Sequence, residues 1–500
     1  MEERIGVIDL GSNTTRLIVM GYRPHHSFRL LDEVRERVRL AEGIGEDKAL
    51  QPAPMQRGIE AMKLFRSFCD ATGVKHIVPV ATSAVREASN QSEFLLQIKK
   101  EAGLEMRVLS AEEEAYYGYL GTANGLTLSD AFLIDIGGGS TQVTMIRGRG
   151  FVHAFSQPIG ALRATDRYVH SDPINKKDFK ALEQAVEETF KDLDWLGRNN
   201  GTILVGIGGT IRTLAEMDRK AHNYPFERVH GYVLRRERLE LIINQLRDLT
   251  LREREQIAGL GRDRADIILS GAVILLQLMK QGHFDSITVS GQGIREGLFY
   301  EHFLEGETPP LFPEIRKFSA QNLARLYDYE PIHVAKVRDL ALSLFDQLRE
   351  LHEYGEWERE LLEYAAILHD IGVAIGYYDH HKHGAYLVLN SSLLGFTHRE
   401  TIILATLVRY HRKGDVKIEE FQEVLADDDQ ERIARLAALL RLAEHLERRK
   451  SQLIQRLDVE IGDSVRVITQ RAEDATVEIW DANRRAGFFK KAYGRDIEVI

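Results

Sequence analysis

Two short segments decide the fold of this chain: DLGSNTTRLIV at residues 9–19 and DIGGGSTQVTM at residues 135–145. Aligned, both read Asp, an aliphatic residue, Gly, two small residues, Ser or Thr, and Thr, and both then return to an apolar strand. A repeated strand–turn–strand loop suggests two similar α/β domains that face each other across a cleft.

Strands and helices alternate around the first copy, which is typical of an α/β fold. The segment 53–72 has apolar residues at helical spacing and is expected to be a helix. A third glycine turn, VGIGGT at residues 205–210, follows an expected strand at 202–205 and runs into a helix. The other expected strands are 5–10, 15–21, 75–81 and 106–109.

The pattern changes from about residue 311, where long amphipathic helices replace the strands. The expected helices are 332–348, 356–368, 399–411 and 431–449. The end of the chain changes again, and a small α+β cap is expected there, with strands at 457–470 and 474–480, a helix at 482–492 and a last strand at Ile497. The predicted domains are therefore 1–123, 124–305, 311–452 and 453–500.

Composition limits the classes of partner. The chain has 500 residues, of which 44% are hydrophobic, enough for two or more globular cores. Its formal net charge is −10, from 66 basic and 76 acidic residues. An acidic chain is a poor general binder of nucleic acid, so a polyanion must bind to local basic clusters or backbone amides. We expect no nucleic-acid partner.

Cysteine content and hydropathy bear on the compartment. Cys69 is the only cysteine, which excludes an intrachain disulfide and fits a reducing compartment. The start MEERIGVIDLG lacks a signal-peptide pattern, and no apolar run reaches the ~20 residues of a membrane helix. The sequence therefore predicts a cytoplasmic protein without a membrane span.

The two glycine turns are candidate phosphate loops. Their closely spaced N–H groups and hydroxyls suit phosphate oxygens, whereas one copy alone is as well explained by an ordinary hairpin. The second copy, with three consecutive glycines, favours a site where backbone approaches a ligand closely. Asp9 and Asp135 each end a buried strand, and coordination of a divalent metal would account for both carboxylates.

Glu114 and Arg86, which lie between the two glycine turns in the sequence, are candidate functional residues. Ser110 and Glu113 form a capping box at a helix start, which leaves Glu114 without a structural role of that kind. A solvated helix face is the alternative. Arg86 follows a strand end, where ligands of open α/β sheets lie, and arginine suits bidentate phosphate contact. A surface arginine is its alternative.

Histidines cluster in the helical part. His369 and Asp370 are adjacent in AAILHDIG, His333 lies on an earlier helix, and DHHKHGAYL adds His380, His381 and His383. Imidazole and carboxylate on neighbouring helices form a plausible metal set. Buried, hydrogen-bonded histidines are the alternative.

Together these segments resemble the exopolyphosphatase/guanosine pentaphosphate phosphatase family, most closely its longer exopolyphosphatase members. The resemblance covers nearly the whole chain. It rests on DLGSNTTRL, ATSAVREASN, LSAEEEAYYGYLG, DIGGGST, GIGGT, RADIILSGAVIL and SGQGIREG within residues 1–305, and on LLEYAAILHDIG, HHKHGAYLVLNS and LVRYHRKG further on.

The resemblance implies duplicated domains of the actin/Hsp70/sugar-kinase (ribonuclease H-like) type, an all-α HD-like domain and the small cap, in a homodimer. It implies Glu114 as the catalytic residue and a Mg²⁺ region at Asp135, Asp9 and Gln142. The expected phosphate-binding residues are Ser12, Asn13, Thr14, Arg86, Gly137, Gly138, Gly139, Ser140, Gly208, Gly209, Thr210 and Arg264. The expected HD-like site comprises His333, His369, Asp370, His383 and Glu444.

Two positions depart from the family's pattern. Gln142 stands where the family has Glu after DIGGGST, which removes a carboxylate from the metal region. Glu444, in RLAEHLERR, stands where the family has Asp, which changes the geometry of a metal ligand.

The expected reaction is Mg²⁺-dependent, processive hydrolysis of the terminal phosphate of inorganic polyphosphate, with Glu114 activating water. The basic stretch 409–413 would extend the phosphate track. The alternatives are a pppGpp phosphohydrolase, an alarmone-binding regulator, a kinase or ATPase of the same superfamily, and a metal phosphohydrolase acting from the helical domain alone.

Overall fold

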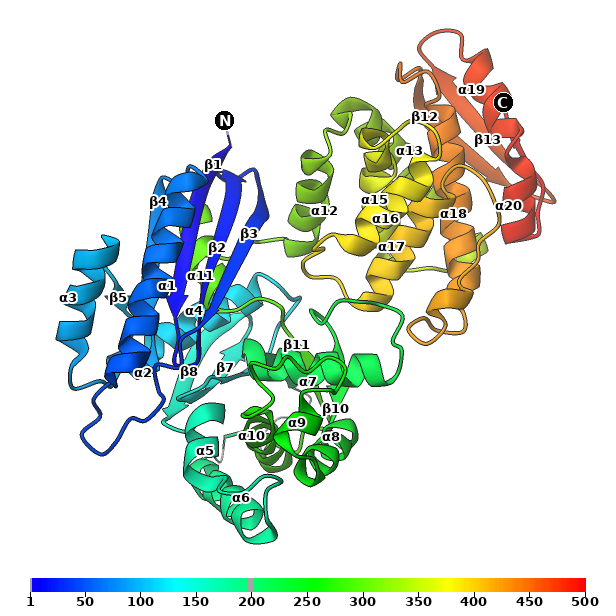
Figure 1. Ribbon diagram of the computed structural model, residues 1–500. Helices are drawn as coiled ribbons and strands as arrows, with labels where there is room; N and C mark the ends of the chain where they lie inside the picture. Colours follow the sequence, from blue (N-terminus) through cyan, green and yellow to red (C-terminus); the bar gives the residue numbers. More distant parts are fainter. Residues whose placement is uncertain (1, 194, 197–201) are drawn as a thin grey trace. The chain divides into compact units, whose positions relative to one another are not determined.

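The computed structural model describes residues 2–193, 195–196 and 202–500, and the chain divides into two compact units, 1–313 and 314–500. Figure 1 shows the sheets and helices of the first unit in blue to green and the helices of the second mainly in yellow to orange. The predicted boundary at 123/124 lies inside the first unit, and the one at 452/453 lies inside the second.

The first sheet has the strand order β3-β2-β1-β4-β5. β1, β2 and β3 form an antiparallel meander, and β4 runs parallel to β1. The apolar run of β1 is buried on both faces, as expected for a central strand. β3 was not predicted, because its charged residues are mostly exposed and give no buried-strand pattern. The strands are β1 (Glu3–Leu10), β2 (Thr14–Arg23), β3 (Ser27–Arg37), β4 (His76–Ala81) and β5 (Arg107–Val108).

The second sheet has the order β10-β11-β9-β6-β7-β8. β6, β7 and β8 again form an antiparallel meander, and β9 runs parallel to β6. The strands are β6 (Ala131–Ile136), β7 (Thr141–Arg147), β8 (Gly150–Gln157), β9 (Ile203–Ile207), β10 (Val233–Arg235) and β11 (Ser286–Val289). Read from the meander outward, β8-β7-β6-β9-β11 repeats the order β3-β2-β1-β4-β5, so the repeated segment belongs to a repeated sheet.

Helices cover these sheets and contribute to one continuous core in the first unit. α1 buries Ile59, Met62 and Phe65, and α10 is buried along nearly its whole length. The helices of this unit are α1 (Pro52–Ala71), α2 (Ser83–Arg86), α3 (Gln91–Ala102), α4 (Ala111–Ala123), α5 (Ala161–Tyr168), α6 (Lys176–Phe190), α7 (Gly208–Ala221), α8 (Arg236–Asp248), α9 (Leu251–Arg254), α10 (Ile268–Gln281) and α11 (Ile294–Phe303).

The second unit is mainly helical. α13, α15, α17 and α18 pack against one another through buried aliphatic residues, which confirms the expected change in pattern. The helices are α12 (Ile315–Leu326), α13 (Pro331–Gln347), α14 (Arg349–His352), α15 (Glu356–Leu368), α16 (His380–Asn390), α17 (His398–Tyr410) and α18 (Asp429–Leu446), with short 3₁₀ turns η1 (Ile371–Ala374) and η2 (Glu419–Phe421). Among the described helices of the whole chain, none is long and apolar enough to cross a membrane.

The C-terminal segment forms a three-stranded sheet with two helices, and its apolar residues join the same core as the helices of this unit. The elements are β12 (Ile454–Ile461), β13 (Val465–Arg471), α19 (Thr476–Asn483), α20 (Ala486–Tyr493) and β14 (Ile497–Val499).

The strand expected at 474–480 is wrong, because α19 occupies this stretch. The buried face of α19 is partly polar: Glu478 accepts from Arg449 at 2.8 Å, and Asp481 pairs with His445 at 2.8 Å. Val477 and Trp480 are exposed instead. The spacing of the apolar residues therefore predicted a strand where the chain forms a helix.

Candidate active site

The two glycine turns face each other across a cleft in the first unit. A Cβ atom at Gly138 would lie 3.1 Å from the Asn13 Cβ, and one at Gly139 would lie 2.9 Å from the Ser12 Oγ. Ser12 also hydrogen-bonds to the Ser83 hydroxyl at 2.9 Å. The absence of side chains in the second turn is therefore what allows the two turns to approach.

The cleft has a volume of about 120 Å³. Most of the predicted phosphate-binding residues line it, whereas Arg86 and Gly139 are not among the lining residues. The predicted residues that line the cleft are Asp9, Ser12, Asn13, Thr14, Glu114, Asp135, Gly137, Gly138, Ser140, Gly208, Gly209, Thr210 and Arg264.

The third glycine turn brings two charged groups together. Gly208 has φ +86°, a backbone conformation that favours glycine, and a Cβ there would collide with the Asp135 carboxylate. A Cβ at Gly209 would collide with the Arg264 guanidinium. The GIGGT turn thus leaves room for the Asp135 carboxylate, from β6, and the Arg264 guanidinium, which precedes α10.

Among the described residues, four carboxylates line the cleft, and three of them, Asp9, Glu114 and Asp135, are predicted site residues from separate elements. Burial, together with the nearby Glu114 carboxylate, raises the pKa of Asp135 to about 7. Burial likewise raises the pKa of Asp9, whose Oδ1 is buried without a hydrogen-bond partner among the described residues. Buried carboxylates with so few donors around them are costly, and a cation would stabilise them.

Glu114 is placed by the start of α4. Ser110 and Glu113 form the predicted capping box, and Glu114 follows on the buried side of the helix. Arg86 Nη1 donates to Glu114 Oε2 at 2.9 Å and to the Leu109 carbonyl at 2.8 Å. Burial raises the pKa of Glu114, although Arg86 opposes the rise. Arg86 was predicted to hold phosphate, and its observed partner is Glu114.

Four arginines line the cleft, and the sequence had singled out only Arg264 as a ligand-binding residue. Arg16 and Arg295 share the Glu33 carboxylate at 3.0 and 2.8 Å. Arg212 donates to the carbonyl oxygens of two glycines. Arg16, Arg212 and Arg295 all lie within or beside the glycine-turn segments, and this position is the sequence feature that could have identified them as cleft residues.

Arg264 has no ion-pair partner within 4 Å among the described residues. Burial, together with the neighbouring arginines Arg35, Arg16 and Arg212, lowers its pKa to about 9. The pKa of Arg212 is lowered to about 10 for the same reasons, with burial the largest. An anion in the cleft would relieve this repulsion.

Gln142 lies opposite Asp135 in the β6–β7 ladder, the position that Arg16 holds opposite Asp9 in β1–β2. Its side chain is buried, hydrogen-bonds to Glu114, and reaches the Ser140 hydroxyl at 3.4 Å. Cross-strand neighbours point to the same face of a sheet. Gln142 therefore lies beside two of the three carboxylates, as a neutral group, although it does not line the cleft itself.

The donor set fits a hard divalent cation. Asp9 and Asp135 offer charged oxygens, and Asp9 Oδ1 lacks any hydrogen-bond partner within the described residues. Their ligand atoms and those of Glu114 do not converge within 4.8 Å as a set of three among the described residues. A cation here would therefore be held by one or two carboxylates together with substrate oxygens, as is usual for Mg²⁺.

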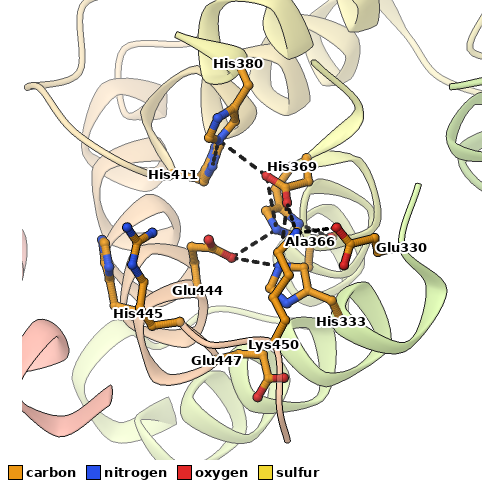
Figure 2. A network of polar contacts seen from close by, with 12 residues as sticks. Glu330, His333, Ala366, His369, His380, His411, Glu444, His445, Glu447 and Lys450 are labelled. Carbon is orange, nitrogen blue, oxygen red and sulfur yellow. Dashed lines mark hydrogen bonds and ion pairs between the residues drawn. The ribbon is translucent and has the colours of Figure 1, made fainter. Parts of the chain in front are cut away.

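A second cluster lies in the helical unit (Figure 2). His333, His369 and Asp370 form one group whose ligand atoms lie within 4.8 Å of one another, and Asp370, His380 and His411 form another. Glu444 Oε2 lies 3.1 Å from His369 Nε2. The predicted member His383 is not part of either group. His380, noted among the histidines of this region, and His411, noted only within a basic stretch, replace it.

A cleft that combines an anion-attracting arginine cluster with buried carboxylates defines an enzyme of phosphoryl chemistry. A sequence profile of the Ppx/GppA phosphatase family matches residues 18–305, and one of Ppx/GppA phosphatase domain III matches residues 315–479. The chain belongs to the Ppx/GppA phosphatase family, and it is a hydrolase that acts on phosphoanhydrides.

The solved structures that resemble this chain belong to shorter proteins, which match it over nearly their whole length. An exopolyphosphatase from Cytophaga hutchinsonii is 28% identical with a TM-score of 0.56, and the match covers 60% of this chain and 98% of that one. The Aquifex aeolicus member of the Ppx/GppA family is 28% identical with a TM-score of 0.52, covering 61% of this chain and 100% of that one.

Proposed function

We propose that the chain is an exopolyphosphatase, which hydrolyses the terminal phosphoanhydride of inorganic polyphosphate with Mg²⁺ and proceeds along the chain. The observation that carries the proposal is the Arg264 guanidinium, which is buried among other arginines and has no ion-pair partner within 4 Å among the described residues. Such a site favours a ligand of high negative charge. The likeness to an exopolyphosphatase of known structure supports the same substrate class.

The residues of the cleft divide the work. Arg264 and the N–H groups of the glycine turns hold the nonbridging oxygens of the terminal phosphate. Glu114, held by Arg86, orients a water for in-line attack and takes its proton. The burial that raises the Glu114 pKa also makes it a better base than an exposed glutamate. Asp9 and Asp135 would hold Mg²⁺, which would offset the charge that develops on the phosphoryl oxygens.

The lining of the cleft favours an inorganic chain over a nucleotide. Its apolar members are the four isoleucines 136, 207, 267 and 294, and no aromatic side chain is among the described lining residues. A nucleobase is commonly held by stacking or by an apolar pocket. This composition favours polyphosphate over pppGpp and ATP as the substrate.

Several finer expectations belong to the same proposal. The repeated sheet order supports kinship with the actin/Hsp70/sugar-kinase fold, and the histidine cluster supports an HD-like assignment for the helical unit. A homodimer remains a prediction from the resemblance, and a cytoplasmic location remains a prediction from the cysteine content and hydropathy of the sequence. Sedimentation velocity of the purified chain would measure its oligomeric state.

The test is phosphate release from polyphosphates of several defined lengths, from pppGpp and from ATP, each with Mg²⁺ and with a chelator. We expect release from polyphosphate to exceed the others and to require the cation. Glu114→Gln should lower kcat by about 10²–10⁴-fold, whereas Glu112→Gln, an exposed neighbour on the same helix, should not change it. Preference for pppGpp, or an active Glu114→Gln protein, would contradict the proposal.

A further inference from the structure

The polar cluster of the helical unit is built from five elements that converge on Asp370, which immediately precedes η1. His333 comes from α13, His369 from the end of α15, His380 from α16, His411 from the end of α17 and Glu444 from α18. All five of these residues are buried. Imidazoles and carboxylates rarely gather in a helical core without a partner that stabilises them.

The histidine rings are oriented by the backbone. The Nδ1 atoms of His369 and His411 each lie 2.7 Å from the carbonyl oxygen three residues earlier, and that of His380 lies 3.0 Å from the Tyr377 carbonyl. Because a carbonyl oxygen only accepts, each Nδ1 carries a proton. In the neutral rings, Nε2 therefore presents a lone pair to the cluster. This is how metal-ligating histidines are commonly held.

Two of these lone pairs point at each other. His380 Nε2 and His411 Nε2 lie 3.2 Å apart, and His380 Nε2 lies 3.3 Å from Asp370 Oδ1. Two neutral rings with protonated Nδ1 atoms would repel at this distance, so the arrangement needs a cation between them or an extra buried proton. Two nitrogen ligands of one tetrahedral ion, with bonds of about 2.0–2.1 Å, lie roughly 3.3 Å apart.

A second set of atoms also lies close to Asp370. Glu444 Oε2 lies 3.1 Å from His369 Nε2 and 3.3 Å from His333 Nε2 (Figure 2). These three atoms and Asp370 Oδ1 are buried, and within the described residues none of them has a partner with hydrogen-bond geometry. His333, His369 and Asp370 thus offer ligand atoms within 4.8 Å of one another, and Glu444 adds a carboxylate oxygen in contact with both imidazoles.

We propose that the helical unit binds two first-row transition-metal ions that share Asp370. His333, His369 and Glu444 hold one ion, and His380 and His411 hold the other. A donor set dominated by imidazole nitrogen selects Zn²⁺, Fe²⁺, Ni²⁺ or a similar ion over Mg²⁺, which prefers oxygen. The centre is distinct from the carboxylates of the phosphatase cleft and is independent of the substrate proposed for that cleft.

Lys450 allows an independent test, because its substitution should change metal affinity in the direction opposite to that of a ligand substitution. Its Nζ lies 3.4 Å from Asp370 Oδ2 and 2.7 Å from Glu330 Oε1, and the side chain is partly exposed. Lys450 thus places a positive charge on the carboxylate that both ions would share. Lys450→Gln should raise metal affinity by a few-fold, since it removes a competing cation, whereas any ligand substitution should lower it.

The experiment uses the untagged full-length chain, freed of metal by a chelator and titrated with Zn²⁺ or Co²⁺ by calorimetry, with elemental analysis after gel filtration. We expect two ions per chain. His411→Ala and Glu444→Gln should each leave one ion, and Asp370→Asn should leave neither bound tightly. His383→Ala is the matched control, because this histidine lies in the same segment outside the cluster, and it should keep both ions.

Two further measurements keep the outcome decisive. Co²⁺ absorption bands typical of nitrogen and oxygen ligation should appear on titration and weaken in His411→Ala. Asp135→Asn, in the phosphatase cleft, should leave both ions and the bands unchanged. Circular dichroism identifies variants that fail to fold. If the ligand variants fail to fold, the metal affinity of Lys450→Gln still tests the proposal. No tightly bound ion in the wild type, equal stoichiometry in Asp370→Asn, or lower affinity in Lys450→Gln would overturn the proposal.

Discussion

Arg86 donates a hydrogen bond to the Glu114 carboxylate at 2.9 Å, across the junction between α2 and the start of α4. This contact fixes the rotamer of Glu114 and opposes the effect of burial on its pKa. Arg86, which the sequence suggested as a phosphate ligand, is on this geometry a positioning residue for the proposed base. The distinction has measurable consequences.

Arg86→Ala should act on the pH dependence of the reaction. Loss of the positive charge raises the Glu114 pKa further, so the deprotonated base forms only at higher pH and the acid limb of kcat/KM moves upward. Loss of orientation should also lower kcat by roughly 10²-fold. Arg107→Ala is the control, because Arg107 pairs with the capping residue Glu113. An unshifted acid limb in Arg86→Ala would contradict this role.

Arg264→Ala should weaken substrate binding. A lost charge-assisted hydrogen bond costs about 1.5–3 kcal/mol, which corresponds to a KM about 10–100-fold higher. Fewer cationic contacts also release fewer counterions, so KM should rise less steeply with salt than in the wild type. Arg262→Ala, an exposed neighbour, should behave as the wild type. A normal KM and salt slope in Arg264→Ala would remove this residue from the site.

Gly209→Ala should reproduce the Arg264 defect without touching the arginine. A methyl group at position 209 would occupy the space of the Arg264 guanidinium, which is the end of a flexible side chain and can move away. We therefore expect a higher KM with the fold retained. The two substitutions should be strongly non-additive, because each removes the same group from the cleft. Additive effects in the double variant would show that Gly209 acts in another way.

Gln142→Glu should lower the Mg²⁺ concentration needed for half-maximal activity, since it adds a charged oxygen beside Asp135 and Glu114. The new carboxylate should also raise the Glu114 pKa by repulsion and move the acid limb to higher pH. Titrating activity against Mg²⁺ at several pH values separates the two effects. Gln142→Met, which is neutral, should not lower the Mg²⁺ requirement. An equal requirement in all three proteins at every pH would place residue 142 outside the cation's reach.

Asp429→Asn should destabilise the helical unit in a pH-dependent way. Burial raises the Asp429 pKa, but hydrogen bonds from Arg399 at 2.8 Å and from the Ala426 N–H outweigh it, so the folded-state pKa is lowered. The stabilisation from this charge is fully present above the unfolded pKa of about 3.9 and is lost as pH falls through the folded value.

Loss of the charge should therefore cost about 1–3 kcal/mol at pH 7 and less near pH 3, which lies below the unfolded pKa. Denaturant unfolding of wild type and Asp429→Asn at both pH values, followed by circular dichroism, measures the difference. Glu431→Gln, on the exposed side of the same helix, is the control. A difference that is the same at both pH values would mean that the carboxylate charge contributes nothing.

The sequence by itself determined several local patterns. The repeat at Asp9 and Asp135, the capping box at Ser110 and the change to helical periodicity near residue 311 are local patterns, and the structure confirms each of them. Such patterns depend on hydrogen bonds and side-chain periods within a few residues, so they can be read without knowing what packs against them.

The tertiary structure decided which side chains meet. Arg86 hydrogen-bonds to Glu114, and four arginines line one cleft among the described residues. His411, rather than His383, lies in the cluster around Asp370. These contacts join residues far apart in the chain, and the helix face on which a histidine lies depends on neighbours that the local pattern does not specify. The same reason explains α19, whose buried face is set by polar contacts with His445 of α18 and with Arg449, which follows that helix, rather than by its own apolar residues.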